Sequence, residues 1–159
     1  MTSIRLPKDR KTLLLLCTTL IWMGVIFFFS SQPADESSKV SGFVAEQILA
    51  VINSVFGRET AAVINRFFFE NALIIRKAGH VTEYLILGLL MSAFLRRVMS
   101  NKFFLTAVII CSLYAVSDEI HQAFVPGRVP TAIDVLIDSV SAAIGAIVIF
   151  LSARKRSMR

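Results

Sequence analysis

Hydrophobic residues along the chain gather into four long stretches that are separated by polar segments. The stretches cover roughly residues 12–30, 78–95, 103–124 and 131–151. A helix of about 20 apolar residues crosses the hydrocarbon core of a bilayer. The pattern therefore predicts an all-α integral membrane protein with four transmembrane helices, forming a single membrane domain over residues 1–159.

The segment between the first two stretches has a different pattern, in which apolar residues recur at helical spacing among polar ones. Residues 39–75 hold two such patterns, which are separated near Gly57. Helices of this kind lie in the interface plane of a membrane or cap a bundle. We predict an amphipathic helical outer segment here, and leave open whether it binds lipid or only caps the bundle. Its apolar positions are Val40, Phe43, Val44, Ile48, Val51, Ile52, Val55, Val63, Ile64, Phe67 and Phe68.

Composition favours a membrane protein over a soluble one. Of the 159 residues, 55% are apolar and only 18% are charged, whereas soluble domains carry about 25% charged residues. Four spans need on the order of 80 residues, so we expect no separate catalytic domain outside the membrane. Cys17 and Cys111 both lie in apolar stretches, and we expect neither a disulfide nor a metal site from them.

Basic residues are concentrated on one side of the predicted spans. Eleven of the 17 Lys and Arg residues lie before the first span, between the second and third, or after the fourth, and Asp9 is the only acid there. Lys and Arg accumulate in the cytoplasmic loops of membrane proteins. We therefore expect both termini to be cytoplasmic. The net charge of +6 then reflects topology, and we expect no nucleic-acid partner.

Three of the four predicted spans lack the uncharged length needed to cross a bilayer. The runs 84–95, 103–117 and 139–153 hold 12, 15 and 15 uncharged residues. They correspond to ~18 to 22 Å of helix, against ~30 Å of hydrocarbon. Arg or Lys marks their inner ends, so the missing length lies at their outer ends. The ionisable residues there are His80, Glu83, Asp118, Glu119, His121, Asp134 and Asp138.

Helical spacing gathers these ionisable residues on one face of each helix. Positions 76, 80 and 83 share a face, as do 114, 118 and 121, and the face of 134 and 138 continues in Ser141 and Gly145, small residues suited to close packing. Ionisable side chains are costly in a membrane unless they face the bundle interior. We therefore predict one outward-facing polar pocket, with the seven ionisable residues as candidate catalytic residues. The alternatives are a hydrogen-bonded network that only holds the bundle together, or a bilayer that thins around short spans.

Three basic residues flank this predicted pocket. Arg76 and Lys77 precede His80, and Arg128 lies in the turn 125–130 beside the acids. A guanidinium binds phosphate or carboxylate through two parallel hydrogen bonds, so these three are candidate ligand-binding residues, with a counter-ion role as the alternative for Arg128. His80, His121 and a carboxylate would suit a divalent metal, but the chain has no compact ligand motif. The sequence leaves the metal and any other cofactor open.

Several motifs resemble the signature of the VanZ-like membrane protein family. They are residues 29–33, 76–84, 117–128 and 134–138, followed by Gly145, and Gly79 stands where a larger residue is expected. The resemblance implies a multi-pass protein of the bacterial cytoplasmic membrane, linked to the cell envelope and to low-level teicoplanin resistance. It supplies no reaction. It adds Tyr84 and Gln122 to the ligand-binding candidates.

Three functions are compatible with such a pocket. The first is binding of an anionic headgroup, carried by a lipid, a cell-wall precursor or a lipoglycopeptide. The second is an outer-leaflet enzyme that uses His, Asp and Glu side chains for acid–base or metal-assisted chemistry on an ester or phosphoester. The third is a proton-coupled transporter. The sequence leaves open whether the site is catalytic and which oligomer the chain forms.

Overall fold

A computed structural model of the chain describes residues 9–70, 72–99 and 102–157. Over these ranges it is all-α, as predicted. The helices are α1 (Arg10–Ser30), α2 (Ala34–Phe56), α3 (Arg58–Glu70), α4 (Ala72–Val98), α5 (Phe103–Gln122) and α6 (Ala132–Ser157). Four of them are long and apolar enough to span a membrane: α1, residues 76–98 of α4, α5, and residues 132–155 of α6. Three of the eleven basic residues counted on the expected cytoplasmic side lie outside the described residues: Arg5, Lys8 and Arg159.

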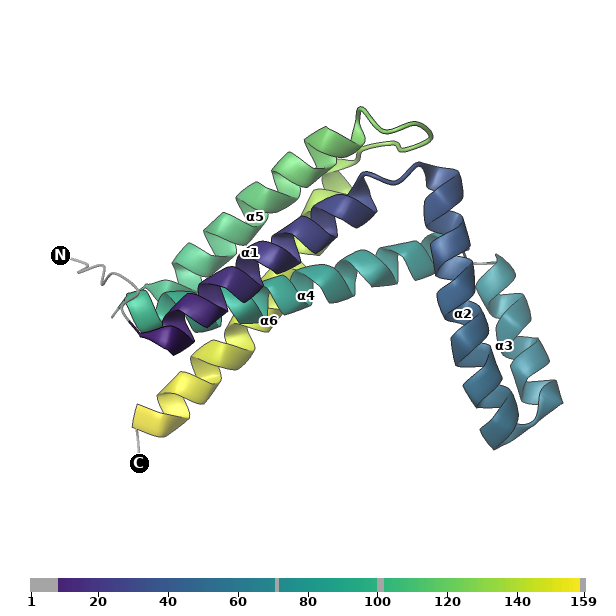
Figure 1. Ribbon diagram of the computed structural model, residues 1–159, viewed down its shortest axis with the longest axis horizontal. Helices are drawn as coiled ribbons and strands as arrows, with labels where there is room; N and C mark the ends of the chain where they lie inside the picture. Colours follow the sequence, from purple (N-terminus) through teal and green to yellow (C-terminus); the bar gives the residue numbers. More distant parts are fainter. Residues whose placement is uncertain (1–8, 71, 100–101, 158–159) are drawn as a thin grey trace.

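The four long helices form a bundle, and α2 and α3 project from one end of it as a hairpin (Figure 1). That end also holds the last turns of α1 and α5 and the first turns of α4 and α6, and we call it the outer end. The opposite, inner end holds the first turn of α1 and the last turn of α6 (Figure 1). Both ends of the described chain therefore lie on one side, as the expected topology requires.

At the outer end, α4 extends beyond its predicted span, whereas α5 and α6 lie within a residue or two of their predicted bounds. The second span begins at Ala72 instead of residue 78, because the helix continues through the polar residues around Arg76. The third ends at Gln122 instead of residue 124, and the fourth begins at Ala132. The outer-end ionisable residues are therefore all helical, and helical spacing does decide which of them share a face.

Close packing of α4 against α6 depends on small residues. A Cβ added at Gly145 would lie 2.2 Å from the backbone oxygen of Leu85, and one added at Gly88 would lie 2.0 Å from that of Ala142. Two alanines of α6, Ala142 and Ala146, are fully buried. The small-residue face of the fourth span therefore packs as its spacing predicts. Gly79 differs, since nothing lies within 4 Å of an added Cβ and a larger residue would fit there.

The α2–α3 hairpin leaves apolar side chains uncovered. Phe43, Val51, Val55 and Val63 are all more than 60% exposed. The side chains at Val40, Val44, Phe67 and Phe68 lie outside the described residues. Exposed apolar side chains on a hairpin at the end of a membrane bundle suit the interface, so lipid contact by this segment stays a prediction.

Candidate functional site

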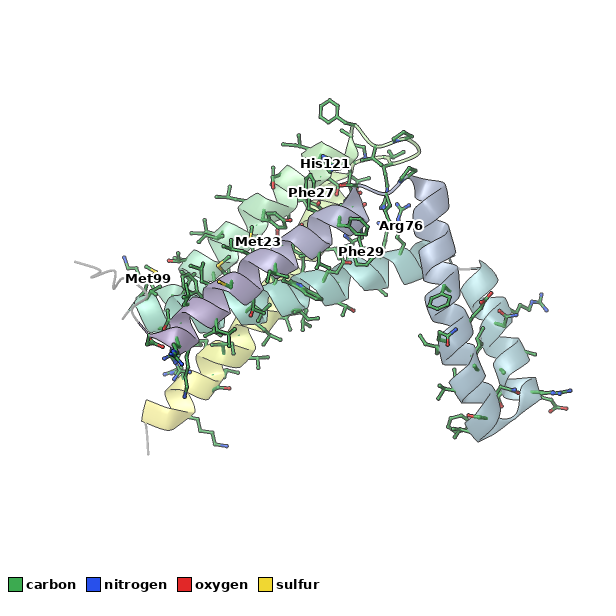
Figure 2. The ribbon with its side chains drawn as sticks, viewed as in Figure 1. Met23, Phe27, Phe29, Arg76, Met99 and His121 are labelled. Carbon is green, nitrogen blue, oxygen red and sulfur yellow. The ribbon has the colours of Figure 1, made fainter. Side chains whose placement is uncertain are left out.

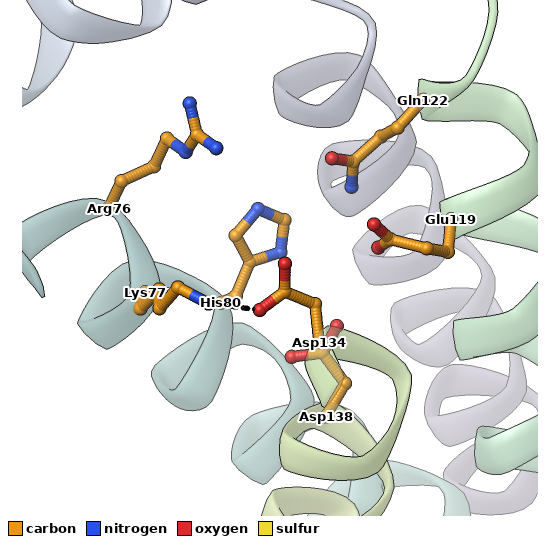
Figure 3. Close-up of a pocket in the computed structure, with 7 residues that line it drawn as sticks. All are labelled: Arg76, Lys77, His80, Glu119, Gln122, Asp134 and Asp138. Carbon is orange, nitrogen blue, oxygen red and sulfur yellow. Dashed lines mark hydrogen bonds and ion pairs between the residues drawn. The ribbon is translucent and has the colours of Figure 1, made fainter. Parts of the chain in front are cut away.

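One pocket at the outer end draws its walls from three helices. Arg76, Lys77 and His80 come from α4, Glu119 and Gln122 from α5, and Asp134 and Asp138 from α6. Arg76 and His80 face Glu119 and Gln122 across it (Figure 3). The cavity itself measures about 20 Å³, which is room for about one water molecule. Seven of the twelve predicted site residues thus meet around one small polar space.

Basic side chains lie at the rim of this pocket, and acids lie deeper. Arg76 and Lys77 occupy the outer turn of α4, whereas Asp138 is one turn further into the bundle than Asp134 and is only 2% exposed. Lys77 is paired with Asp134. Arg76 makes no hydrogen bond or ion pair within the described part of the chain. It is therefore the rim cation that keeps its charge available for a ligand.

Arg128 holds the outer end of α1 in place. Its Nε and Nη2 donate hydrogen bonds to the backbone oxygens of Gln32 and Phe29, both at 3.2 Å. A cation suits this position, because the carbonyl end of a helix carries partial negative charge. The third nitrogen, Nη1, is buried and has no hydrogen-bond partner in the residues that the structure describes. Arg128 does lie beside the acids, but its two side-chain hydrogen bonds in the described residues go to the backbone at the end of α1 and just beyond it.

The two guanidiniums at the outer end are close enough to influence each other. Burial lowers the pKa of Arg128, and the positive charge of Arg76 lowers it further, while the carboxylates of Asp118 and Glu119 act in the opposite direction. Arg128 and Arg76 therefore repel each other across the top of the site. An anion placed near Arg76 would relieve this repulsion.

Asp118 belongs to a buried network between α1 and α5 instead of to the pocket wall. Its Oδ2 accepts hydrogen bonds from the hydroxyl of Ser30 at 2.8 Å and from Nε2 of Gln122 at 3.2 Å. Its Oδ1 is buried and has no hydrogen-bond partner among the described residues. Gln122 also lines the pocket, so it connects this network to the pocket.

The two histidines do not meet, contrary to the convergence expected from the sequence. His121 stacks on Phe27 with ring centroids 4.3 Å apart, and its Nε2 lies 3.0 Å from the hydroxyl of Ser31 (Figure 2). His80 lies in the pocket instead. Over the described ranges, no group of three or more His, Cys, Asp or Glu side chains is placed to hold a metal ion. The metal set suggested by the sequence is thus not assembled.

Glu83 and Tyr84 lie one turn below His80. Oε2 of Glu83 is 3.7 Å from Nδ1 of His80, and the backbone oxygen of Glu83 accepts a hydrogen bond from the indole of Trp22 at 2.9 Å. Tyr84 is fully buried, and within the described residues its hydroxyl has no hydrogen-bond partner. Neither predicted residue lines the pocket, but Glu83 contacts His80, which does.

An apolar groove runs along the lipid-facing side of α5 and α6 next to the polar pocket. It measures about 320 Å³, within the usual range of ligand sites. Glu119 lines the groove as well as the pocket, and its Oε1 accepts a hydrogen bond from the backbone N–H of Thr131 at 2.8 Å. The side chain of Glu119 therefore stands between the polar and apolar spaces. The other groove residues are Val116, Ile120, Ala123, Phe124, Pro130, Thr131, Ala132 and Val135.

Sequence reasoning missed the contributions of α1 to this site. Ser30 and Ser31 bind Asp118 and His121, and Trp22 binds the backbone of Glu83. The available signal was the pair of serines that closes an otherwise apolar span. In the sequence these two serines stand out only as part of the motif at residues 29–33.

Comparison with known proteins shows the family of the chain. A family model described as VanZ/LLP1 matches residues 15–153, a range that includes the pocket, the groove and most of each of the four long helices. Neither the curated proteins nor the solved structures gave a match. The chain is a multi-pass membrane protein by its four spanning helices, and it belongs to the VanZ/LLP1 family.

Proposed function

We propose that the protein binds an amphiphile with an anionic headgroup at its outer end. The phosphate or carboxylate of the ligand lies on Arg76 at the rim of the pocket. Its acyl chain lies in the groove between α5 and α6. Lipids, lipid-linked cell-wall precursors and lipid-bearing glycopeptides share this chemistry, which fits the family's link to glycopeptide resistance.

The observation that carries this proposal is that the guanidinium of Arg76, at the rim, makes no hydrogen bond or ion pair within the described residues. Its charge also opposes that of Arg128. Charge-assisted hydrogen bonds from a guanidinium to an oxyanion are about twice as strong as neutral ones. An anion at Arg76 would therefore gain such bonds and also remove the repulsion between the two guanidiniums.

The small size of the pocket favours a headgroup at its mouth over one inside it. A cavity of about 20 Å³ holds about one water molecule, so a phosphate group cannot enter without displacing side chains. The ion pair between Lys77 and Asp134 also lies on this wall. We therefore place the anion against Arg76, with the carboxylates beneath available to accept hydrogen bonds from hydroxyl or ammonium groups of the ligand.

The apolar groove explains why the ligand should be an amphiphile. Because Glu119 lines both spaces, the groove lies directly beside the pocket, and the chain of a ligand held at the pocket mouth has an apolar surface next to it. Ile120 and Phe124 are 59% and 82% exposed on that surface. Burying apolar surface contributes about 25 cal/mol per Å² when water is removed, but much less where lipid already covers it. Contacts to the headgroup therefore decide which amphiphile binds, and the groove fixes the direction of its acyl chain.

Dodecyl phosphate is a suitable probe, because it carries one phosphate and one chain. Its binding to the purified full chain can be followed by the fluorescence of Trp22, the single tryptophan of the sequence, whose indole is bonded to the backbone of Glu83. Loss of a charged hydrogen bond costs about 1.5–3 kcal/mol, so Arg76→Gln should weaken binding roughly tenfold to a hundredfold. Arg76 is a better test than Arg128, whose removal would also free the end of α1.

The matched control is Arg58→Gln, which removes the same charge from an exposed residue of α3. It should bind dodecyl phosphate like the wild type. Dodecyl maltoside should compete poorly in all three proteins, because it has the chain without the anion. Equal affinity for dodecyl phosphate in the wild type and Arg76→Gln would refute the proposal.

A further inference from the structure

A second cavity lies at the inner end of the bundle, far from the outer pocket. It measures about 440 Å³ and is lined by residues of α1, α4 and α6 and by the residue that precedes α1. Polar and apolar residues share its walls, so it has the character of an amphiphile site. The lining residues are Asp9, Leu15, Ala93, Arg96, Arg97 and Ile149.

Arg97 is fixed in this cavity by residues at the start of α1. Its Nε donates a hydrogen bond to the hydroxyl of Thr12 at 2.7 Å, and its Nη2 donates to Oδ1 of Asp9 at 3.0 Å. Asp9 in turn accepts hydrogen bonds from the backbone N–H and the hydroxyl of Thr12, at 3.0 and 2.6 Å. Thr12 is only 2% exposed. The planar guanidinium is therefore held in one orientation before any ligand arrives.

The negative charge of Asp9 in this cavity is already balanced by Arg97. Hydrogen bonds from Thr12, together with the positive charge of Arg97, lower the pKa of Asp9 to about 2. Its negative charge is thus present at neutral pH and is balanced by Arg97. Arg96 makes no hydrogen bond or ion pair in the part of the chain that the structure describes. The cavity therefore carries one uncompensated positive charge.

The surroundings add to this charge. At the inner end the described residues include seven Lys and Arg side chains against the single acid Asp9. They are Arg10, Lys11, Arg96, Arg97, Lys102, Arg154 and Lys155. Leu15, Ala93 and Ile149 form the apolar part of the wall, on the side facing the middle of the bilayer. The cavity is thus basic toward the water and apolar toward the lipid.

We propose that this cavity binds an anionic phospholipid from the leaflet at the inner end. The lipid phosphate binds Arg96 and the remaining donors of Arg97, and an acyl chain runs along Leu15 and Ile149. Basic pockets between transmembrane helices bind anionic lipid headgroups in this way. The proposal is independent of the outer site, because no residue lines both cavities.

Native mass spectrometry of the purified full chain tests this directly. The protein is incubated with equal amounts of dioleoyl phosphatidylglycerol and dioleoyl phosphatidylcholine, and the retained lipids are counted. The wild type should retain phosphatidylglycerol preferentially, and Arg96→Gln should lower that retention about tenfold or more. Arg96 is chosen over Arg97, because changing Arg97 would also break its bonds to Asp9 and Thr12.

Two further variants separate the cavity from general surface charge. Lys102→Gln removes a charge at the same end outside the cavity and should leave the preference unchanged. Ala93→Phe fills the cavity without changing charge and should reduce retention like Arg96→Gln. Equal loss in Arg96→Gln and Lys102→Gln, or full retention in both Arg96→Gln and Ala93→Phe, would overturn the proposal.

Discussion

The contact between α4 and α6 makes a quantitative prediction for Gly145→Ala. The added methyl group would lie 2.2 Å from the backbone oxygen of Leu85 and 2.9 Å from the backbone nitrogen of Leu89. Ordinary contacts of a Cβ begin near 3.4 Å, so α6 must retreat by about 1.2 Å at this point. A backbone atom cannot turn aside as a side chain can, and the helices must therefore separate.

The cost of this separation follows from packing. Extra methyl groups in a well-packed core cost about 1–3 kcal/mol, and a gap of up to 1 Å forfeits about a quarter to a half of each dispersion contact that it opens. We expect Gly145→Ala to lie near the upper limit, about 3 kcal/mol. For a chain of this size, 1 kcal/mol corresponds to about 2–4 °C in melting temperature. The expected decrease is therefore roughly 6 to 12 °C.

Thermal melting of the detergent-solubilised full chain, followed by Trp22 fluorescence, measures this effect. Gly24→Ala is the matched control, because nothing lies within 4 Å of an added Cβ at that position of α1. It should melt at or slightly above the wild-type temperature, since Ala favours helix over Gly by about 1 kcal/mol. The packing argument is wrong if Gly145→Ala and Gly24→Ala melt within about 2 °C of each other.

Three further predictions concern the polar groups. Asp118→Ala should lower the melting temperature more than Asp118→Asn, because alanine cannot accept the hydrogen bonds that Ser30 and Gln122 donate to Asp118. Each buried group left unsatisfied costs about 1–3 kcal/mol. Similar melting of the two variants would contradict this. The pKa of Asp9 is about 2 in the folded protein, against its usual 3.8. The ionised carboxylate of Asp9 therefore stabilises the fold fully at pH values above 3.8, and this stabilisation is lost as the pH falls through about 2. Asp9→Asn should therefore melt below the wild type at pH 7, and the difference should close between about pH 4 and pH 2; a gap that persists at the lower pH argues against the bonds to Asp9. Chelation with EDTA should leave the melting temperature unchanged, because no metal set is assembled in the described residues; a decrease that zinc reverses would disprove this.

The outer cluster could be predicted because two simple rules act together. The short uncharged runs required ionisable residues within the spans, and helical spacing placed Arg76 and His80 on one face, and Asp134 and Asp138 on another. Both pairs do line the pocket. Arg128 was likewise expected beside the acids, and Asp118 and Glu119 lie close enough for their charges to oppose the lowering of its pKa by burial.

The direction of His121 could not be predicted, because spacing fixes a face of one helix without saying which neighbour covers it. Asp118 and His121 share a face of α5, and α1 covers that face with Phe27 and Ser30. Glu119 and Gln122 are the residues of α5 that line the pocket. The bonds from Arg128 to the carbonyls of α1 were hidden for a similar reason, since backbone acceptors leave no signal in a sequence.

The most direct test of the central proposal is an experimental structure of the full chain with dodecyl phosphate bound. We predict phosphate density at the outer end, with oxygens about 2.7–2.9 Å from the guanidinium of Arg76, and density for the chain in the groove between α5 and α6. Phosphate bound elsewhere at the outer end, or only in the inner cavity beside Arg96, would contradict the account.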